Sequence, residues 1–330
     1  MTRVLLTHTP EMFDGYYGAA ALAALTEAVE VVRYTGTPYL KTNELIALAK
    51  DCQIILSDRA TPGEAALFAA LPSLAAFLRC AVDIRTIDVA AASAHGVLVT
   101  RATPGFVNAV NEWILGAMID LARRISQSAI AYRRGEEPVA RLGIQLSGAT
   151  LGIVGLGAIG RQLALTAAQL GMKVLVHDPY VTEVPAYAEA ASFSGILTRA
   201  DFVVSLAVAN DSAENLFGES AFAQMKNSAF FINPSRGNLV DEPALIAALE
   251  SASIAGAALD VGRAPDQKPS MALAQRADVI ATPHIGGLTR DAVEHQAFDT
   301  VRQVKALIAG EMPDGAVNPE QASRLTVFRR

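Results

Sequence analysis

The chain has 330 residues, of which 52% are hydrophobic and 18% are charged, and its formal net charge is −6. This length predicts roughly two domains, and an acidic balance without a basic stripe argues against a nucleic-acid partner. No apolar run approaches the roughly 20 residues that cross a bilayer, so we expect no membrane association. The two cysteines, Cys52 and Cys80, form no disulfide framework and no metal-ligand spacing. We therefore expect a cytoplasmic protein without a metal.

The N-terminal part of the chain alternates between short apolar runs and Ala- and Leu-rich stretches with helical spacing. Such alternation predicts a parallel sheet with crossover helices. The predicted strands are residues 3–8, 29–34, 52–58 and 96–100. A long apolar helix is predicted next, at residues 111–124, and the polar, Gly-containing stretch after it is predicted to be a loop.

The alternation restarts more clearly after residue 148. The predicted strands are residues 150–156, 172–178, 201–208, 229–234, 254–261 and 278–284. A last helix is predicted at 289–310, where a glycine stops it. The whole pattern predicts an α/β protein with two doubly wound domains.

The stretch GLGAIG, residues 155–160, follows a predicted strand and opens a predicted helix. In such a loop Gly155 permits a tight turn, Gly157 lets a pyrophosphate approach the backbone, and Gly160 lets helix and strand pack closely. The N-terminus of the helix would add unpaired N–H groups and a partial positive charge. The pattern predicts a dinucleotide site.

An acid ends the next predicted strand, at Asp178. Its carboxylate can accept hydrogen bonds from the ribose hydroxyls of the adenosine and would repel a 2′-phosphate. The residues that follow, Pro179, Tyr180 and Val181, include no Arg or Lys that would favour NADP. The sequence therefore predicts NAD as the cofactor.

Three polar side chains follow three later strands, in the segments FFINPSRG, GAALDVG and VIATPHIGG. They are Arg236, Asp260 and His284, and in an open α/β sheet such positions share the edge at which ligands bind. Reduction of a carbonyl by a hydride leaves an alkoxide, to which His284 can give a proton. Arg236 can bind a carboxylate and polarise the adjacent carbonyl. A 2-oxo acid offers both groups on adjacent carbons.

These motifs, together with residues 225–245, resemble the D-isomer-specific 2-hydroxyacid dehydrogenases, the formate/glycerate dehydrogenase-like family. The resemblance covers most of the chain. It implies two Rossmann-like domains, with an NAD domain at 101–288 inserted into a flavodoxin-like substrate domain made of 1–100 and 289–330. It also implies a homodimer built around the helix at 111–124.

The resemblance also implies roles for individual residues. Arg236 and His284 would be catalytic, and Asp260 would bind the nicotinamide amide. The residues expected to bind the cofactor are Gly155, Gly157, Ala158, Ile159, Gly160, Asp178, Pro179, Val208, Asn233, Pro234, Arg236, Asp260, His284 and Gly286. Those expected to bind the substrate are Val82, Asp83, Arg236 and His284.

The chain departs from the family pattern where an acid normally pairs with the catalytic histidine. The family's D-V-F-x-x-E-P has its Glu at the position of Pro265 here. One hypothesis is that Asp266, one residue later, takes this role after a loop shift. The rival hypothesis is that no acid pairs with the histidine, and that Gln267 supplies an amide instead.

Two further departures lie in the substrate loop, residues 79–88, and after Ser205, where Ala207 and Ala209 replace the histidine and proline of the family's S-L-H-x-P segment. The family's glycines in the loop correspond to Ala81 and Asp83, and its Asp to Arg85.

The sequence favours a dehydrogenase for D-2-hydroxy acids over two alternatives. One is a non-catalytic NAD(H)-binding regulator, as in the related C-terminal-binding-protein corepressors. The other is a dehydrogenase for another oxyanion such as phosphonate. The side chain of the substrate, the physiological direction and the pathway stay open.

Overall fold

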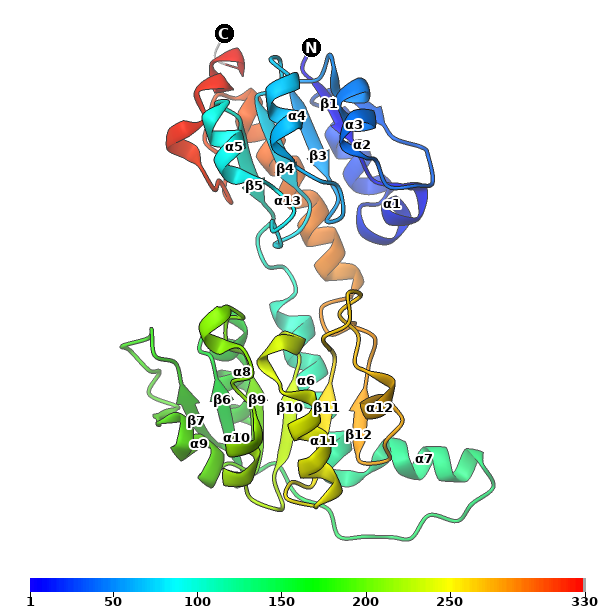
Figure 1. Ribbon diagram of the computed structural model, residues 1–330, viewed down its shortest axis with the longest axis vertical. Coiled ribbons are helices and arrows are strands. Elements are labelled where there is room, and N and C mark those ends of the chain that lie inside the picture. Colours follow the sequence, from blue (N-terminus) through cyan, green and yellow to red (C-terminus); the bar gives the residue numbers. More distant parts are fainter. Residues whose placement is uncertain (329–330) are drawn as a thin grey trace. The chain divides into compact units, whose positions relative to one another are not determined.

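The computed structural model describes residues 1–328, and the chain divides into two compact units. Unit 1 consists of Met1–Phe106 together with the chain from Thr289 onward, and unit 2 is the continuous segment Val107–Leu288. In each unit, helices flank a parallel sheet (Figure 1).

Unit 1 contains a five-stranded sheet in the order β2-β1-β3-β4-β5, with all pairs parallel. The strands are β1 Arg3–Leu6, β2 Glu30–Arg33, β3 Ile54–Ser57, β4 Ala76–Arg79 and β5 Leu98–Arg101. The helices are α1 Pro10–Tyr16, α2 Ala19–Thr26, α3 Thr42–Ala49, α4 Ala65–Ala70, α5 Val89–Ala94 and α13 Arg290–Ile308. This strand order is that of flavodoxin-like domains.

The core of unit 1 has two halves, because successive side chains on a strand point to opposite faces of the sheet. Val4 and Leu6 pack with side chains of α1, α2 and α13. Leu5 packs with side chains of α3, α4 and α5 on the other face. Both halves are apolar, as is typical of a parallel sheet covered on both sides.

Unit 2 contains a seven-stranded parallel sheet in the order β12-β11-β10-β9-β6-β7-β8. The strands are β6 Thr150–Val154, β7 Lys173–His177, β8 Glu189–Ala190, β9 Phe202–Ser205, β10 Phe230–Asn233, β11 Gly256–Leu259 and β12 Val279–Ala281. The helices are α6 Val107–Arg123, α7 Ile125–Arg133, α8 Ala158–Gln169, α9 Phe193–Arg199, α10 Glu219–Gln224, α11 Glu242–Glu250 and α12 Met271–Ala274. The strand order reverses between β6 and β9, which is where doubly wound sheets bind their ligands.

The predicted α/β class with two doubly wound domains is confirmed. Strand β4 and helix α7 are among the elements that were not predicted. Strand β4 comes from the Ala-rich run LAAFLR, whose composition favours a helix, and burial between its neighbours in the sheet overrides that propensity. Helix α7 has no buried residue, so no apolar periodicity marks it.

Candidate functional site

The glycine loop connects β6 to α8 in a conformation that needs two of its glycines. Gly155 has φ +107°, in the region that side chains disfavour, and a Cβ there would collide with the backbone of Leu206. A Cβ at Gly160 would collide with the carbonyl oxygen of Gly155. Gly157, the residue before α8, faces open space and has no side-chain cap. The free N–H groups at this helix terminus suit an anionic diphosphate.

Asp178 follows β7 and is joined to this loop. One carboxylate oxygen accepts a hydrogen bond of 2.7 Å from the backbone N–H of Leu156, and the other accepts one of 2.9 Å from that of Tyr180. Each carboxylate oxygen can accept a further bond, as a ribose hydroxyl would require. The open approach at Gly157 and the acid beside the loop therefore fit a dinucleotide such as NAD.

The turn after β10 holds Arg236. The buried Asn233 shapes it, since its Nδ2 donates to the carbonyl of Arg236 at 2.9 Å and its Oδ1 accepts from the N–H of Ser235 at 3.1 Å. Arg236 is half-buried, and one of its terminal nitrogens donates to the carbonyl of Ser235 at 2.8 Å. Its neighbour Pro234 is buried, whereas Val208, also expected to bind the cofactor, is exposed.

Asp260 follows β11 and is 2% exposed. Its carboxylate accepts hydrogen bonds from the hydroxyl of Thr282 at 2.6 Å and from the N–H groups of Ile285 at 2.8 Å and Gly286 at 2.7 Å. These three donors bracket His284 in the chain. The buried acid therefore contacts the loop that holds His284. The sequence did not predict this contact, because two of the donors are backbone groups. Binding of the nicotinamide amide by Asp260 stays a prediction.

His284 lies three residues past β12 in a left-handed backbone conformation, with φ +60°. Such a conformation costs a non-glycine residue about 1–3 kcal/mol, although His adopts it more readily than most. Its N–H donates to the carbonyl of Thr282 at 2.9 Å, and its side chain is half-buried. Because the strands are parallel, His284, Asp260, Arg236 and the glycine loop share one edge of the sheet.

Asp266 lies on the exposed loop after β11. Its carboxylate accepts a 3.2 Å bond from the N–H of Lys268 and forms a 3.1 Å ion pair with the Lys268 ammonium. These contacts hold the pKa of the carboxyl below its usual range. The next residue, Gln267, has φ +60° and accepts a bond from the N–H of Gly262. The pairing of either residue with His284 stays a prediction.

In unit 1, the substrate loop follows β4. Val82 is half-buried, and the Asp83 carboxylate accepts hydrogen bonds from the guanidinium of Arg85 at 2.6–3.1 Å. The guanidinium of Arg85 thus offsets the negative charge of Asp83, and binding of a substrate by this loop stays a prediction. These hydrogen bonds also raise the pKa of Arg85 above its ordinary value.

Arg79, at the end of β4, was not singled out from the sequence as a functional residue. An arginine that closes the apolar run LAAFLR is nevertheless a signal of a buried, hydrogen-bonded group. It is fully buried, and it donates to the carbonyls of Asp58 and Thr61 and to the hydroxyl of Thr86. Burial lowers the pKa of its guanidinium to about 10. Arg79 thereby joins the loop after β3 to the substrate loop.

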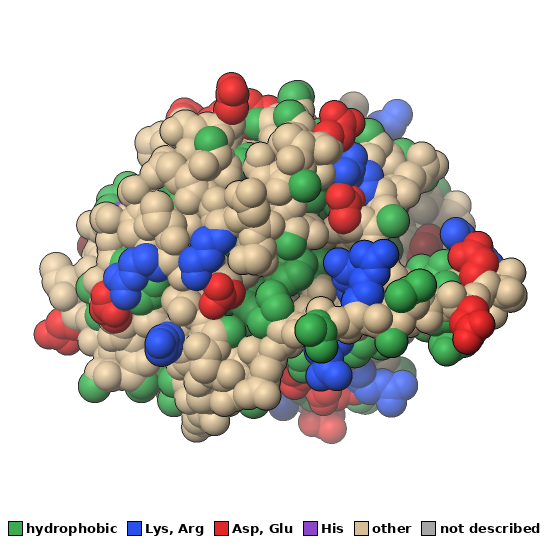
Figure 2. Space-filling view, turned by 90° about the horizontal axis from the view of Figure 1, so that it is seen from below, with side chains coloured by type: hydrophobic (Ala, Val, Ile, Leu, Met, Phe, Trp, Pro, Cys, Tyr) green, Lys and Arg blue, Asp and Glu red, His purple; other side chains and the backbone are tan. Residues whose placement is uncertain are grey.

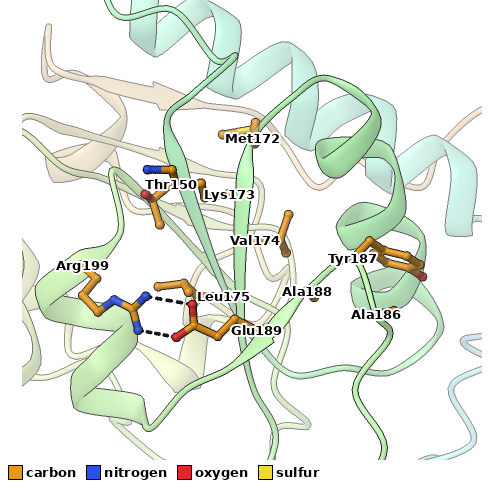
Figure 3. A pocket seen from close by; sticks show the side chains of 10 residues that line it. All are labelled: Thr150, Met172, Lys173, Val174, Leu175, Ala186, Tyr187, Ala188, Glu189 and Arg199. Atoms are coloured by element: carbon orange, nitrogen blue, oxygen red, sulfur yellow. Dashed lines mark hydrogen bonds and ion pairs between the residues drawn. The ribbon is translucent and has the colours of Figure 1, made fainter.

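Unit 2 also has a hollow away from this edge of the sheet. A hollow of about 510 Å³ in unit 2 is lined by Thr150 and Lys173, which begin β6 and β7, and by the Glu189–Arg199 ion pair (Figure 3). It lies at the opposite end of these strands from the glycine loop.

Among residues 1–328, no cluster of His, Cys, Asp and Glu could hold a metal ion, and none of the helices described could span a membrane.

The sheet order of unit 2, its glycine loop and the acid after β7 define a doubly wound α/β protein that binds a dinucleotide. Residues 115–286 match the family described as D-isomer specific 2-hydroxyacid dehydrogenase, NAD binding domain. The chain belongs to this family, and unit 2 holds its NAD-binding domain. The resemblance seen in the sequence is confirmed.

Curated relatives include two D-3-phosphoglycerate dehydrogenases. The protein from Methanocaldococcus jannaschii is 32% identical over 305 residues, which are 90% of this chain and 57% of that protein. The protein from Mycobacterium leprae is 33% identical over 305 residues, which are 91% of this chain and 57% of that protein. The chain thus spans little more than half the length of these relatives.

Solved structures agree on the fold. A D-lactate dehydrogenase with NAD⁺ from Lactobacillus jensenii has a TM-score of 0.83 and 26% identity, covering 96% of this chain and 99% of that chain. A glyoxylate reductase from Paecilomyes thermophila has a TM-score of 0.81 and 26% identity, covering 97% of this chain and 99% of that chain.

Proposed function

We propose that the protein is an NAD-dependent dehydrogenase that transfers a hydride between nicotinamide and C2 of a D-2-hydroxy acid or the corresponding 2-oxo acid. The observation that carries the proposal is the presence of Arg236 and His284 at the sheet edge where the glycine loop lies. Membership of the 2-hydroxyacid dehydrogenase family supports the reaction type.

In this proposal, the glycine loop and Asp178 would hold NAD, which would supply or accept the hydride. Arg236 binds the substrate carboxylate with its planar fork of donors and polarises the C2 carbonyl. His284 gives a proton to the C2 oxygen in reduction and takes it back in oxidation. Binding of the substrate by Val82 and Asp83, in the loop after β4, stays a prediction.

The proposed acid partner of His284 is Asp266, with Gln267 as the rival. The ion pair of Asp266 with Lys268 does not oppose this role strongly, because both side chains are more than half exposed. Exposed ion pairs contribute about 0–1 kcal/mol, so a small loop movement could exchange the partner of Asp266.

We also propose that the protein is a homodimer in the cytoplasm. The segment 125–148, here called the arm, comprises α7 and the loop after it and has no buried residue. A helix of nine residues is marginal on its own, and the arm exposes Ile130, Tyr132, Val139 and Leu142. Figure 2 shows a face on which apolar side chains gather in a hollow beside Lys and Arg, the kind of surface that a partner covers.

The proposed compartment follows from the cysteines. The free, buried Cys52 and Cys80 suit a reducing compartment such as the cytoplasm.

The test is NADH consumption near neutral pH with 2-oxo acids from glyoxylate to bulky aromatic ones. Turnover that disappears in His284→Ala supports the dehydrogenase, and the preferred side chain gives the substrate class. Absence of turnover across the panel, with NADH binding detected by fluorescence, would instead favour a regulator or another oxyanion substrate.

A further inference from the structure

The carboxylate of Asp260 fixes the backbone on both sides of His284. A carboxylate offers about four acceptor positions, and three of those on Asp260 are used by Thr282 before the histidine and by Ile285 and Gly286 after it. A Cβ at Gly286 would lie 2.9 Å from one of these oxygens, so a side chain there would push the acid away. The left-handed conformation of His284 is thus imposed by a buried acid.

The hydroxyl of Thr282 links this acid to α6. The indole N–H of Trp113 donates to the Thr282 hydroxyl oxygen at 3.1 Å, and the hydroxyl donates to Asp260 at 2.6 Å. An indole nitrogen can only donate, and a hydroxyl has a single hydrogen. The direction of this chain of hydrogen bonds is therefore determined: it runs from Trp113 to Thr282 to Asp260. Trp113 also packs against Gly286, since a Cβ there would lie 3.6 Å from its ring.

We propose that Trp113 and Thr282 are positioning residues for His284, acting through the carboxylate of Asp260. This inference rests on the proposed function, in which His284 moves the proton. Trp113 orients the hydroxyl, the hydroxyl orients the acid, and the acid sets the backbone on which the imidazole stands. Loss of this chain of hydrogen bonds would displace the imidazole and slow proton transfer, while leaving the glycine loop and Asp178 in place.

The experiment compares Thr282→Val, which removes the hydroxyl at nearly constant shape, with Thr282→Ser, which keeps it. We expect Thr282→Val to lower kcat by about 100-fold, as a misplacement of about 1 Å can, and to change the Kd for NADH far less. Thr282→Ser should restore most of kcat. Trp113→Phe keeps the ring and removes its N–H, and should lower kcat by about threefold to tenfold.

Amide hydrogen exchange in the free protein gives a readout independent of turnover. We expect faster exchange at Ile285 and Gly286 in Thr282→Val and in Trp113→Phe, and wild-type exchange in Thr282→Ser. Unchanged exchange in both altered proteins, or equal losses of kcat in the Val and Ser variants, would overturn the inference. If the wild-type protein reduces no 2-oxo acid, the proposed function fails while the exchange measurement still tests the positioning.

Discussion

The Asp178 carboxylate accepts a hydrogen bond from the backbone N–H of Leu156, so the acid after β7 is tied to the glycine loop after β6. The two parts of the predicted dinucleotide site, which lie on different strands, are therefore held in one arrangement before any ligand binds. Preorganisation of this kind reduces the ordering cost of binding.

Replacement of Asp178 with Asn should weaken NADH binding and reduce the preference for NADH over NADPH. Hydrogen bonds to a charged group contribute about 1.5–3 kcal/mol, so we expect the Kd for NADH to rise by about tenfold or more. Fluorescence titration with both cofactors measures the change. Glu183→Gln, at an exposed acid in the loop after β7, is the control. Wild-type affinity in Asp178→Asn would remove Asp178 from the cofactor site.

Alanine at two glycines of the loop should separate folding from binding. Gly160→Ala places a methyl against the carbonyl of Gly155 and should lower the free energy of unfolding by about 1–3 kcal/mol. Gly157→Ala has room for its methyl and φ −71°, so its stability should stay unchanged while NADH affinity falls. Urea unfolding and NADH titration of both variants test this. An equally large loss of stability in Gly157→Ala would contradict it.

Acid should destabilise unit 1 through His8. Burial lowers the pKa of this histidine from 6.5 to about 4, with nearby Asp58 opposing the shift and Arg79 adding to it. Because the unfolded chain takes up this proton near pH 6.5 and the folded protein only near 4, stability is lost as the pH falls between these values. The loss is on the order of 3 kcal/mol.

Urea unfolding of the wild type and of His8→Gln between pH 7.5 and pH 4.5 measures this loss. The variant should show a shallower decline than the wild type, whatever its stability at neutral pH. His95→Gln, at a half-buried histidine, provides the matched control and should decline as the wild type does. Parallel curves for the wild type and His8→Gln would assign the acid sensitivity to other groups.

A charge on the arm should weaken the proposed dimer. The side chain of Leu142 is fully exposed in the single chain, so Leu142→Asp should not affect folding of the protomer. If a second copy covers the arm, burial of the new carboxylate would oppose association. Sedimentation equilibrium should then show a dimer for the wild type and for Leu48→Asp, on α3 of unit 1, and a monomer for Leu142→Asp. A monomeric wild type would refute the proposal.

Replacement of Asp266 with Asn tests the acid partner of His284. A neighbouring carboxylate raises the pKa of a histidine, so its removal should lower the apparent pKa in the pH profile of kcat/KM. Lys268→Met, which removes the competing ammonium, should leave this pKa in place or raise it. The same profile in Asp266→Asn and the wild type would move the role to Gln267 or to no side chain.

The parts of the site that could be predicted are those marked by local chemistry. GLGAIG and Asp178 follow strands and have residue types that a dinucleotide requires, and the structure joins them by a hydrogen bond. Arg236, Asp260 and His284 were placed at strand ends by apolar periodicity, and the parallel sheet puts them on one edge.

The unpredicted parts depend on contacts that leave no local pattern. The carboxylate of Asp260 binds the backbone of residues 285 and 286, and backbone N–H groups are the same in every sequence. Arg79 is buried because carbonyls of a distant loop accept its hydrogen bonds, and burial in a sheet overrides the helical propensity of β4.

Unit 1 is made of two chain segments, and this has a consequence for synthesis. Helix α13 contributes Ala297, Val301, Val304 and Leu307 to the core on one face of its sheet, and those residues leave the ribosome after the whole of unit 2. Domains that are continuous in sequence can fold as they emerge, so unit 2 can complete its fold first. Until α13 emerges, α1 and α2 cover only part of this apolar face of the sheet. This interval is therefore the one in which a chaperone would bind.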